Sequence, residues 1–140
     1  MEFSRRDTLA LGLGAAALTV LPFQVNAAAD DFISNFTGGA DVIEGGEGLT
    51  LTAPEIAENG NTVPVAVEAA GATAIMVLAM GNPVPGVATF NFGELAGSQS
   101  ASTRIRLAGT QDVVAVAKMA DGSFVKVGRT VKVTIGGCGG

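Results

Sequence analysis

Short runs with apolar residues at every second position, separated by turn residues, limit the fold of this chain more than any other feature. Every second residue of 63–68 is a valine, and Ile105 and Leu107 alternate with two arginines. A spacing of two places alternate side chains on opposite faces of a β-strand, so that one face is buried and the other meets water. Residues 73–80 are apolar at almost every position, which predicts a central strand covered on both faces. The sequence therefore predicts an all-β fold.

A β-hairpin is the clearest local prediction. Residues 112–119 and 123–127 flank Asp121-Gly122, a dipeptide that strongly favours a tight hairpin turn. Residues 130–135 predict a third, separate strand. Its apolar side would be formed by Val131, Val133 and Ile135.

These patterns together predict one domain over residues 30–135. Residues 30–36 are interpreted as a helical turn, and about seven short antiparallel strands follow. That number of strands is typical of an immunoglobulin-like β-sandwich. The connections between them, such as residues 59–61 and 82–86, are rich in Asn, Pro and Gly, as expected for turns.

Residues 1–29 have the layout of an export signal. Arg5 and Arg6 precede an apolar stretch of 13 residues, 9–21, and small residues follow it. This stretch is shorter than the roughly 20 residues that a membrane-spanning helix needs. The paired arginines resemble a twin-arginine signal, although Thr8 stands where such signals usually carry Phe. We therefore expect the mature domain in the periplasm.

The composition excludes several kinds of active site. Without histidine, the chain has no Ser-His-Asp or Cys-His nucleophile and no His-ligated metal site. Cys138 is the single cysteine, which excludes an internal disulfide and a Cys-x-x-Cys pair. The net charge of −5 disfavours nucleic-acid binding. We expect no catalytic residues, no metal site and no cofactor.

Two further groups of side chains have simpler structural interpretations. Met76, Met80 and Met119 offer thioether ligands for copper(I), but methionine more often fills an apolar core. Arg104 and Arg106 share one face of a strand, and a solvated sheet edge explains them better than an anion or partner site.

The reactive group of the chain lies in the sequence Gly136-Gly137-Cys138-Gly139-Gly140. Glycine loses the most conformational freedom on ordering, so we expect residues 136–140 to form a mobile, exposed arm. Three interpretations of the thiol are open: an incidental thiol at a frayed terminus, a disulfide that links two chains, and a covalent carrier that presents a substrate to separate enzymes. Small residues on both sides of the thiol favour the carrier. Gly136 and Gly137 would then act as a hinge, and Gly139 and Gly140 as a slim tip.

Several segments closely resemble the SoxY family, the sulfur-carrier subunits of the bacterial sulfur-oxidation (Sox) system. Besides the pentapeptide they are residues 53–60 (APEIAENG), 82–90 (NPVPGVATF), 104–111 (RIRLAGTQ) and 114–117 (VAVA). The resemblance implies an immunoglobulin-like sandwich. It also implies that Cys138 is joined oxidatively to thiosulfate, or to another reduced sulfur species, as a cysteine S-thiosulfonate.

The same resemblance implies partners. The carrier would form a tight heterodimer with SoxZ, a second small β-protein. The c-type cytochrome SoxAX would load it, the hydrolase SoxB would release sulfate, and the sulfane dehydrogenase SoxCD would oxidise the remaining sulfur. The carrier itself would be no enzyme and would bind no metal or cofactor.

Two other functions are left open. A non-catalytic, exported β-sandwich module would be cross-linked to a partner through Cys138. β-Grasp sulfur carriers also end in two glycines and carry sulfur on the last carboxylate, here that of Gly140, but their ATP-dependent activation does not fit an exported protein. The mass and position of an adduct would distinguish these functions from a carrier loaded on Cys138.

Overall fold

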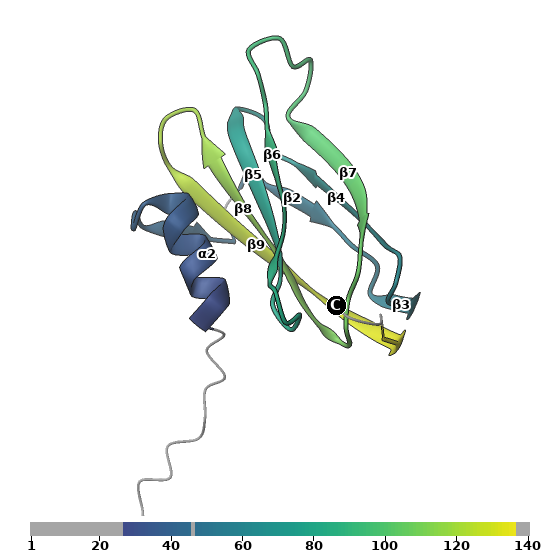
Figure 1. Ribbon diagram of the computed structural model, residues 1–140. Coiled ribbons are helices and arrows are strands. Elements are labelled where there is room, and N and C mark those ends of the chain that lie inside the picture. The colour runs from purple at the N-terminus through teal and green to yellow at the C-terminus, as the bar shows by residue number, and fades with distance from the viewer. Residues whose placement is uncertain (1–26, 46, 137–140) are drawn as a thin grey trace, which may run out of the picture.

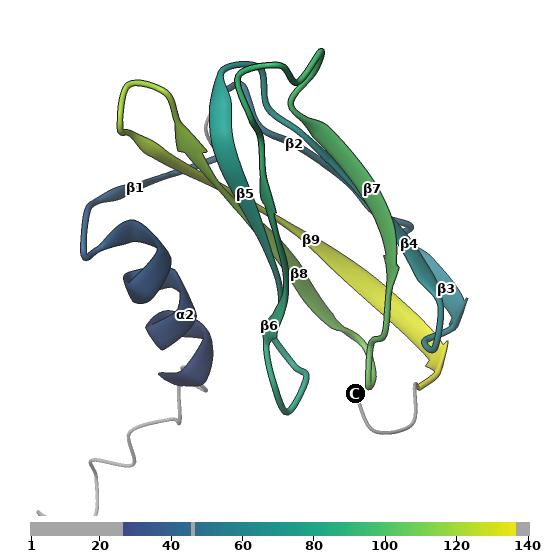
Figure 2. The same ribbon diagram turned by 45° about the horizontal axis from the view of Figure 1, so that its top comes forward.

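The structure, a computed structural model, describes residues 27–45 and 47–136. Two β-sheets face each other, and one helix packs on the outer face of the larger sheet (Figures 1 and 2). The elements of the described part are α2 (Ala27–Thr37), β1 (Val42–Glu44), β2 (Thr50–Thr52), β3 (Ile56–Asn59), β4 (Val63–Glu68), β5 (Ala72–Ala79), β6 (Gly86–Asn91), β7 (Ser100–Ile105), β8 (Gln111–Met119) and β9 (Phe124–Ile135).

The larger sheet has the strand order β1-β9-β8-β5-β6, and β3 pairs with β9 as well. The smaller sheet has the order β2-β4-β7. Most neighbours are antiparallel, but β1 and β3 both run parallel to β9. The twelve-residue β9 is long enough to pair with β1 near its beginning and with β3 near its end.

The predicted class, an all-β immunoglobulin-like sandwich, is confirmed, but three details of the prediction are wrong. The described residues contain nine strands rather than about seven, and two of the pairings are parallel. The predicted separate strands 123–127 and 130–135 form, from Phe124 on, the single strand β9. Gly128 lies between them in register with Val114 of β8, so the glycine continues the ladder instead of turning the chain.

The core between the two sheets follows the alternation seen in the sequence. Val63, Val65 and Val67 of β4 are all buried, as predicted. On β5, Ile75 and Val77 pack into the same core, which confirms a central strand that is covered on both faces.

The other face of β5 is covered by α2, not by a second sheet. Met76 and Leu78 belong to a smaller cluster that the helix covers with Ile33 and Phe36. Phe36 also meets Phe124 edge to face, with ring centroids 5.9 Å apart. The predicted helical turn is therefore a helix of three turns that completes the core of the larger sheet.

The helix also contains the end of the predicted export signal. Residues 1–26 lie outside the described residues, while residues 27–29 form the start of α2. Ala29 is completely buried. No helix among the described residues is long and apolar enough to cross a membrane.

Candidate functional site

Most of the predicted arm lies outside the described residues. This holds for Cys138 and for Gly137, Gly139 and Gly140, whereas Gly136 is described. The geometry that the structure provides is therefore that of the arm root, the place where β9 ends and Gly136 begins.

Three segments meet at the arm root. Gly60, which follows β3, donates its N–H to the carbonyl oxygen of Ile135 at 2.7 Å. The carbonyl oxygen of Gly60 accepts the N–H of Leu107, also at 2.7 Å. The last residue of β9 is thus linked through Gly60 to the loop between β7 and β8, residues 106–110. Figure 2 shows the ends of β9 and β3 side by side at this end of the sandwich.

The first glycine of the arm packs directly on this loop. A Cβ built on Gly136 would overlap the carbonyl oxygen of Ala108 and would lie 3.3 Å from its carbonyl carbon. Any side chain at this position would therefore require the Ala108 peptide to move. The structure gives Gly136 a steric role in addition to the hinge predicted from the sequence.

A buried pair of amide side chains holds the loop through hydrogen bonds to its backbone. Asn82 donates Nδ2–H to the carbonyl oxygen of Arg106 at 2.8 Å, and its Oδ1 accepts the N–H of Ala108 at 2.9 Å. Gln111 donates Nε2–H to the same Oδ1 at 2.9 Å and to the carbonyl oxygen of Gly109 at 3.1 Å. We call Asn82 and Gln111 the amide pair.

Thr110 ties the end of the loop to β9. Its Oγ1 accepts the N–H of Val133 at 3.0 Å, three residues before Gly136. This contact, the amide pair and Gly60 together give every residue of 106–110 a hydrogen bond.

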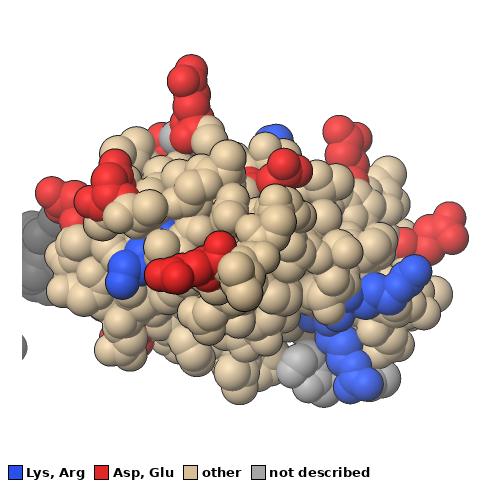
Figure 3. Space-filling model, turned by 90° about the horizontal axis from the view of Figure 1, so that it is seen from above, with Lys and Arg blue, Asp and Glu red and all other residues tan. Residues whose placement is uncertain are grey.

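Charged side chains around this end of the molecule are exposed. Arg104 and Arg106 lie on the outer side of the chain that enters the loop, and Nη1 of Arg104 is 3.4 Å from Oγ1 of Thr62. Figure 3 shows basic side chains close together at one end of the visible face, with acidic side chains beside them and over the rest of the face. The structure brings the two arginines to the same end of the sandwich as the arm root.

Two carboxyl groups of the described residues have a clearly lowered pKa, and both lie elsewhere. The hydrogen bond and the charge of Lys126, 2.8 Å away, lower the pKa of Glu44 on β1. The side-chain and backbone hydrogen bonds of Ser123 lower the pKa of Asp121 in the β8–β9 turn. Both groups stabilise the strand pairings around the start of β9 and are not part of the arm root.

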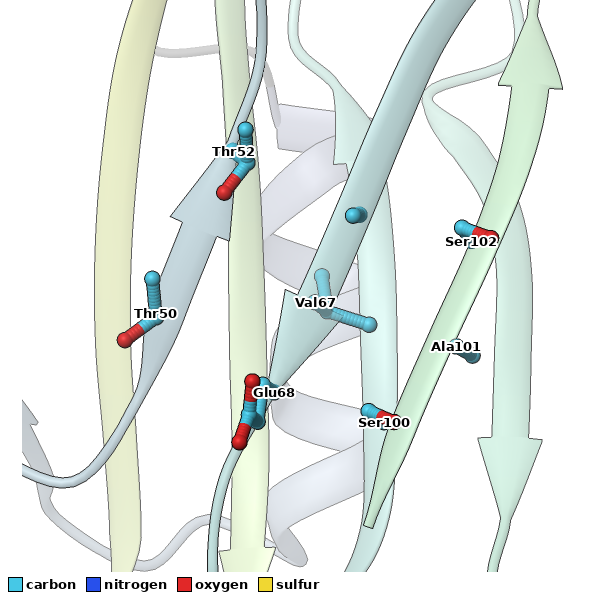
Figure 4. A pocket seen from close by; sticks show the side chains of 8 residues that line it. Thr50, Thr52, Val67, Glu68, Ser100, Ala101 and Ser102 are labelled. Carbon is cyan, nitrogen blue, oxygen red and sulfur yellow. The ribbon is translucent and has the colours of Figure 1, made fainter. Parts of the chain in front are cut away.

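Two shallow hollows lie on the outer face of the smaller sheet. The first, of about 340 Å³, is lined mainly by small side chains of β2, β4 and β7. Figure 4 shows Thr50 and Thr52 on one side of it and Ser100 and Ser102 on the other, with Glu68 at one end. The second, of about 570 Å³, extends past Pro64 to Arg104. Neither hollow contains a nucleophile paired with a base.

The methionines lie in the apolar clusters. Met76 is buried and Met80 packs beside it under α2, while Met119 packs against the core between the sheets. Among the described residues there is no group of three His, Cys, Asp or Glu side chains arranged to hold a metal ion.

Comparison with known protein families assigns the chain to one of them. The family described as "Sulfur oxidation protein SoxY" matches residues 33–138, a range that includes Cys138. This chain belongs to the SoxY family. A solved structure of the sulfur carrier protein SoxY from Chlorobium limicola f thiosulfatophilum is 36% identical, covers 78% of this chain and 98% of its own, and superposes with a TM-score of 0.67. The family resemblance seen in the sequence is thereby confirmed.

More distant structures share the fold alone. The superoxide reductase (neelaredoxin) from Ignicoccus hospitalis is 13% identical, covers 62% of this SoxY-family chain and 80% of its own, and gives a TM-score of 0.55. A search of curated proteins finds no match.

Sequence reasoning missed the residues that support the arm root. Asn82 was interpreted as part of an ordinary turn, and Gln111 was not singled out. The available signal was a polar amide next to an apolar strand: Asn82 follows one such run, in a proline-rich turn, and Gln111 begins another. Ala108 and Gly60 act through backbone atoms, for which the sequence carries no signal.

Proposed function

We propose that this chain is a periplasmic sulfur carrier that holds thiosulfate-derived intermediates covalently on Cys138 and presents them to partner enzymes. The observation that carries the proposal is the SoxY family match, which extends to Cys138, the single cysteine of the chain. The related structure from Chlorobium is named a sulfur carrier protein, which supports the same role.

The loading chemistry needs a thiol and an external electron acceptor. One S–S bond forms between the sulfur of Cys138 and the terminal sulfur of thiosulfate, the thiol proton is released, and two electrons pass to a c-type cytochrome. The reacting form is the thiolate. We propose that SoxAX accepts the electrons, SoxB then hydrolyses the sulfonate to sulfate, and SoxCD oxidises the sulfur that remains.

The residues of the chain agree with a role in which this protein carries the substrate and its partners catalyse the reactions. A carrier takes its catalysis from its partners, and this chain has no histidine to serve as a general base near neutral pH. The sandwich would supply a stable body that pairs with SoxZ, and residues 136–140 would enter an active site that the folded domain cannot enter. Five extended residues span at most about 17 Å.

Intact mass spectrometry of the protein from cells grown on thiosulfate tests the proposal. We expect reducible additions of about 112 Da (thiosulfonate) or about 32 Da (sulfane), which fragmentation places on the only thiol. The variant Cys138→Ser should fold, bind its partner and carry no addition. Sulfur on Gly140, a stable protein–protein disulfide, or loading of the serine variant would overturn the proposal.

A further inference from the structure

We propose that the amide pair, Asn82 and Gln111, positions the arm by fixing the Ala108 carbonyl against which Gly136 packs. Gly136 is then an anchored first residue of the arm. This inference deepens the proposed carrier function and rests on it only where turnover with partner enzymes is concerned.

The first step of the argument is the close approach of two backbones. The chain at Gly136 lies so near the Ala108 peptide that a Cβ on the glycine would overlap the carbonyl oxygen. Backbones approach this closely only where a side chain is missing. Glycine at this position is therefore explained by packing, whereas the hinge interpretation explains it by conformational freedom alone.

The second step is that the Ala108 peptide cannot easily give way. The peptide unit before it is held because the Ala108 N–H is bonded to Oδ1 of Asn82, and the peptide unit after it is held because the carbonyl oxygen of Gly109 accepts Nε2–H of Gln111. The carbonyl oxygen of Arg106 accepts a hydrogen bond from Nδ2 of Asn82. One buried asparagine thus holds both ends of the three-residue segment 106–108. Leu107, between them, is completely buried and is bonded to Gly60.

The third step is that the amide pair is itself held firmly. Asn82 is 7% exposed and Gln111 is 9% exposed. Oε1 of Gln111 accepts the N–H of Gly81 at 2.8 Å, and a Cβ on Gly81 would lie 2.9 Å from Cβ of Gln111. Every buried polar side-chain atom of the described residues has a partner. A fully satisfied polar network of this kind fixes one local geometry.

The functional consequence concerns how the arm is presented. If the chain leaves the sandwich at a fixed point and in a fixed direction, fewer orientations of the thiol must be searched when a partner binds. A mutation far from the reacting atoms that misplaces them by about 1 Å can lower the rate on the order of a hundredfold. The amide pair would be a positioning element, since it touches neither substrate nor thiol.

The first test measures backbone order in the full chain by ¹⁵N relaxation and needs no partner enzyme. For the Gly136 amide of the wild type we expect an order parameter near that of rigid backbone, about 0.85, and in Asn82→Ala a fall below about 0.6. A flexible Gly136 in the wild type, or an unchanged order parameter in the folded variant, would overturn the inference. Neither result would bear on whether Cys138 carries sulfur.

A second variant covers the case in which Asn82→Ala does not fold. Gly136→Ala leaves the amide pair and the core intact but forces the Ala108 peptide or the arm to move. We expect changed amide shifts at Ala108 and Gly109 with an unchanged melting temperature. Gly97→Ala is the matched control, because a Cβ there meets nothing within 4 Å. Wild-type shifts at Ala108 in Gly136→Ala would refute the packing of the two backbones.

The second test distinguishes an effect on the direction of the arm from a general loss of structure. With the cytochrome that loads the carrier, we expect the KM for Gly136→Ala to rise on the order of tenfold, with kcat within about twofold. Alkylation of Cys138 by iodoacetamide should keep its wild-type rate in the same variant, because a small reagent does not depend on the direction of the arm. An unchanged KM would overturn the positioning role, whereas loss of loading in the wild type would overturn the carrier function instead.

Discussion

The ring of Phe32 in α2 lies against the backbone of Gly86 at the start of β6, so that a Cβ on the glycine would be 2.5 Å from Cε1 of the ring. We expect Gly86→Ala to push the ring away and to lower the free energy of unfolding by about 1 kcal/mol, at the lower end of overpacking costs because Phe32 is 38% exposed and can turn outward. Urea unfolding measures the change.

A double-mutant cycle shows whether the two residues interact directly. In a Phe32→Ala background the added methyl group of Gly86→Ala meets no ring, so its cost should largely disappear. Equal costs of Gly86→Ala in both backgrounds would show that Phe32 does not determine the effect.

A prediction for stability concerns Leu107, which is completely buried beside the arm root. Leu107→Ala should lower the free energy of unfolding by about 2–5 kcal/mol, because it removes buried methyl groups and leaves a cavity. Leu95→Ala is the matched control: Leu95 is 99% exposed, and its replacement should change stability by less than about 0.5 kcal/mol. Similar denaturation midpoints for the two variants would mean that the loop contributes little to the core.

The sequence was sufficient for those parts of the fold that depend on local patterns. The valines of residues 63–68 and the apolar run of β5 identify buried strand faces because side chains alternate at every residue. The Asp121-Gly122 turn joins β8 and β9 as predicted, and Gly122 has a φ of 87°. Each of these signals lies within a few neighbouring residues.

Parts that depend on distant contacts were not predicted. β1, β2 and β3 have three or four residues each, too few to show an alternation, and the parallel pairings of β1 and β3 are made along β9. The amide pair joins residues that are 29 positions apart, and only the folded chain brings them together. For the site, the composition of residues 136–140 predicts the thiol as the attachment point, which stays a prediction, and it carries no sign of the loop on which Gly136 packs.

The pH dependence of the β8–β9 turn follows from Asp121. Its Oδ1 accepts the Ser123 Oγ–H at 2.6 Å and the Ser123 N–H at 2.8 Å, and both bonds lower the pKa of the carboxyl group. The group therefore stabilises the folded state above the pKa of the unfolded chain, and this contribution is lost as the pH falls through the lowered pKa. A ¹³C NMR titration of the carboxyl carbon should show a midpoint that rises in Ser123→Ala. Ser100→Ala, on β7 of the smaller sheet, should leave it unchanged. A Ser123→Ala midpoint equal to the wild type would show that the hydroxyl does not act on Asp121.

The last prediction concerns α2, whose first residues end the predicted export signal. The helix covers an apolar face of the larger sheet that includes Met76, Leu78 and Val116. A chain that begins at Asp41 should expose this face, bind the dye ANS and self-associate in size-exclusion chromatography, because uncovered apolar patches of this kind favour association. A chain that begins at Ala28 keeps nearly all of the helix, including the buried Ala29, and should stay monodisperse with a higher melting temperature. If the two chains behave alike, the helix is dispensable for the fold; if they differ as expected, α2 is needed to complete the core of the larger sheet.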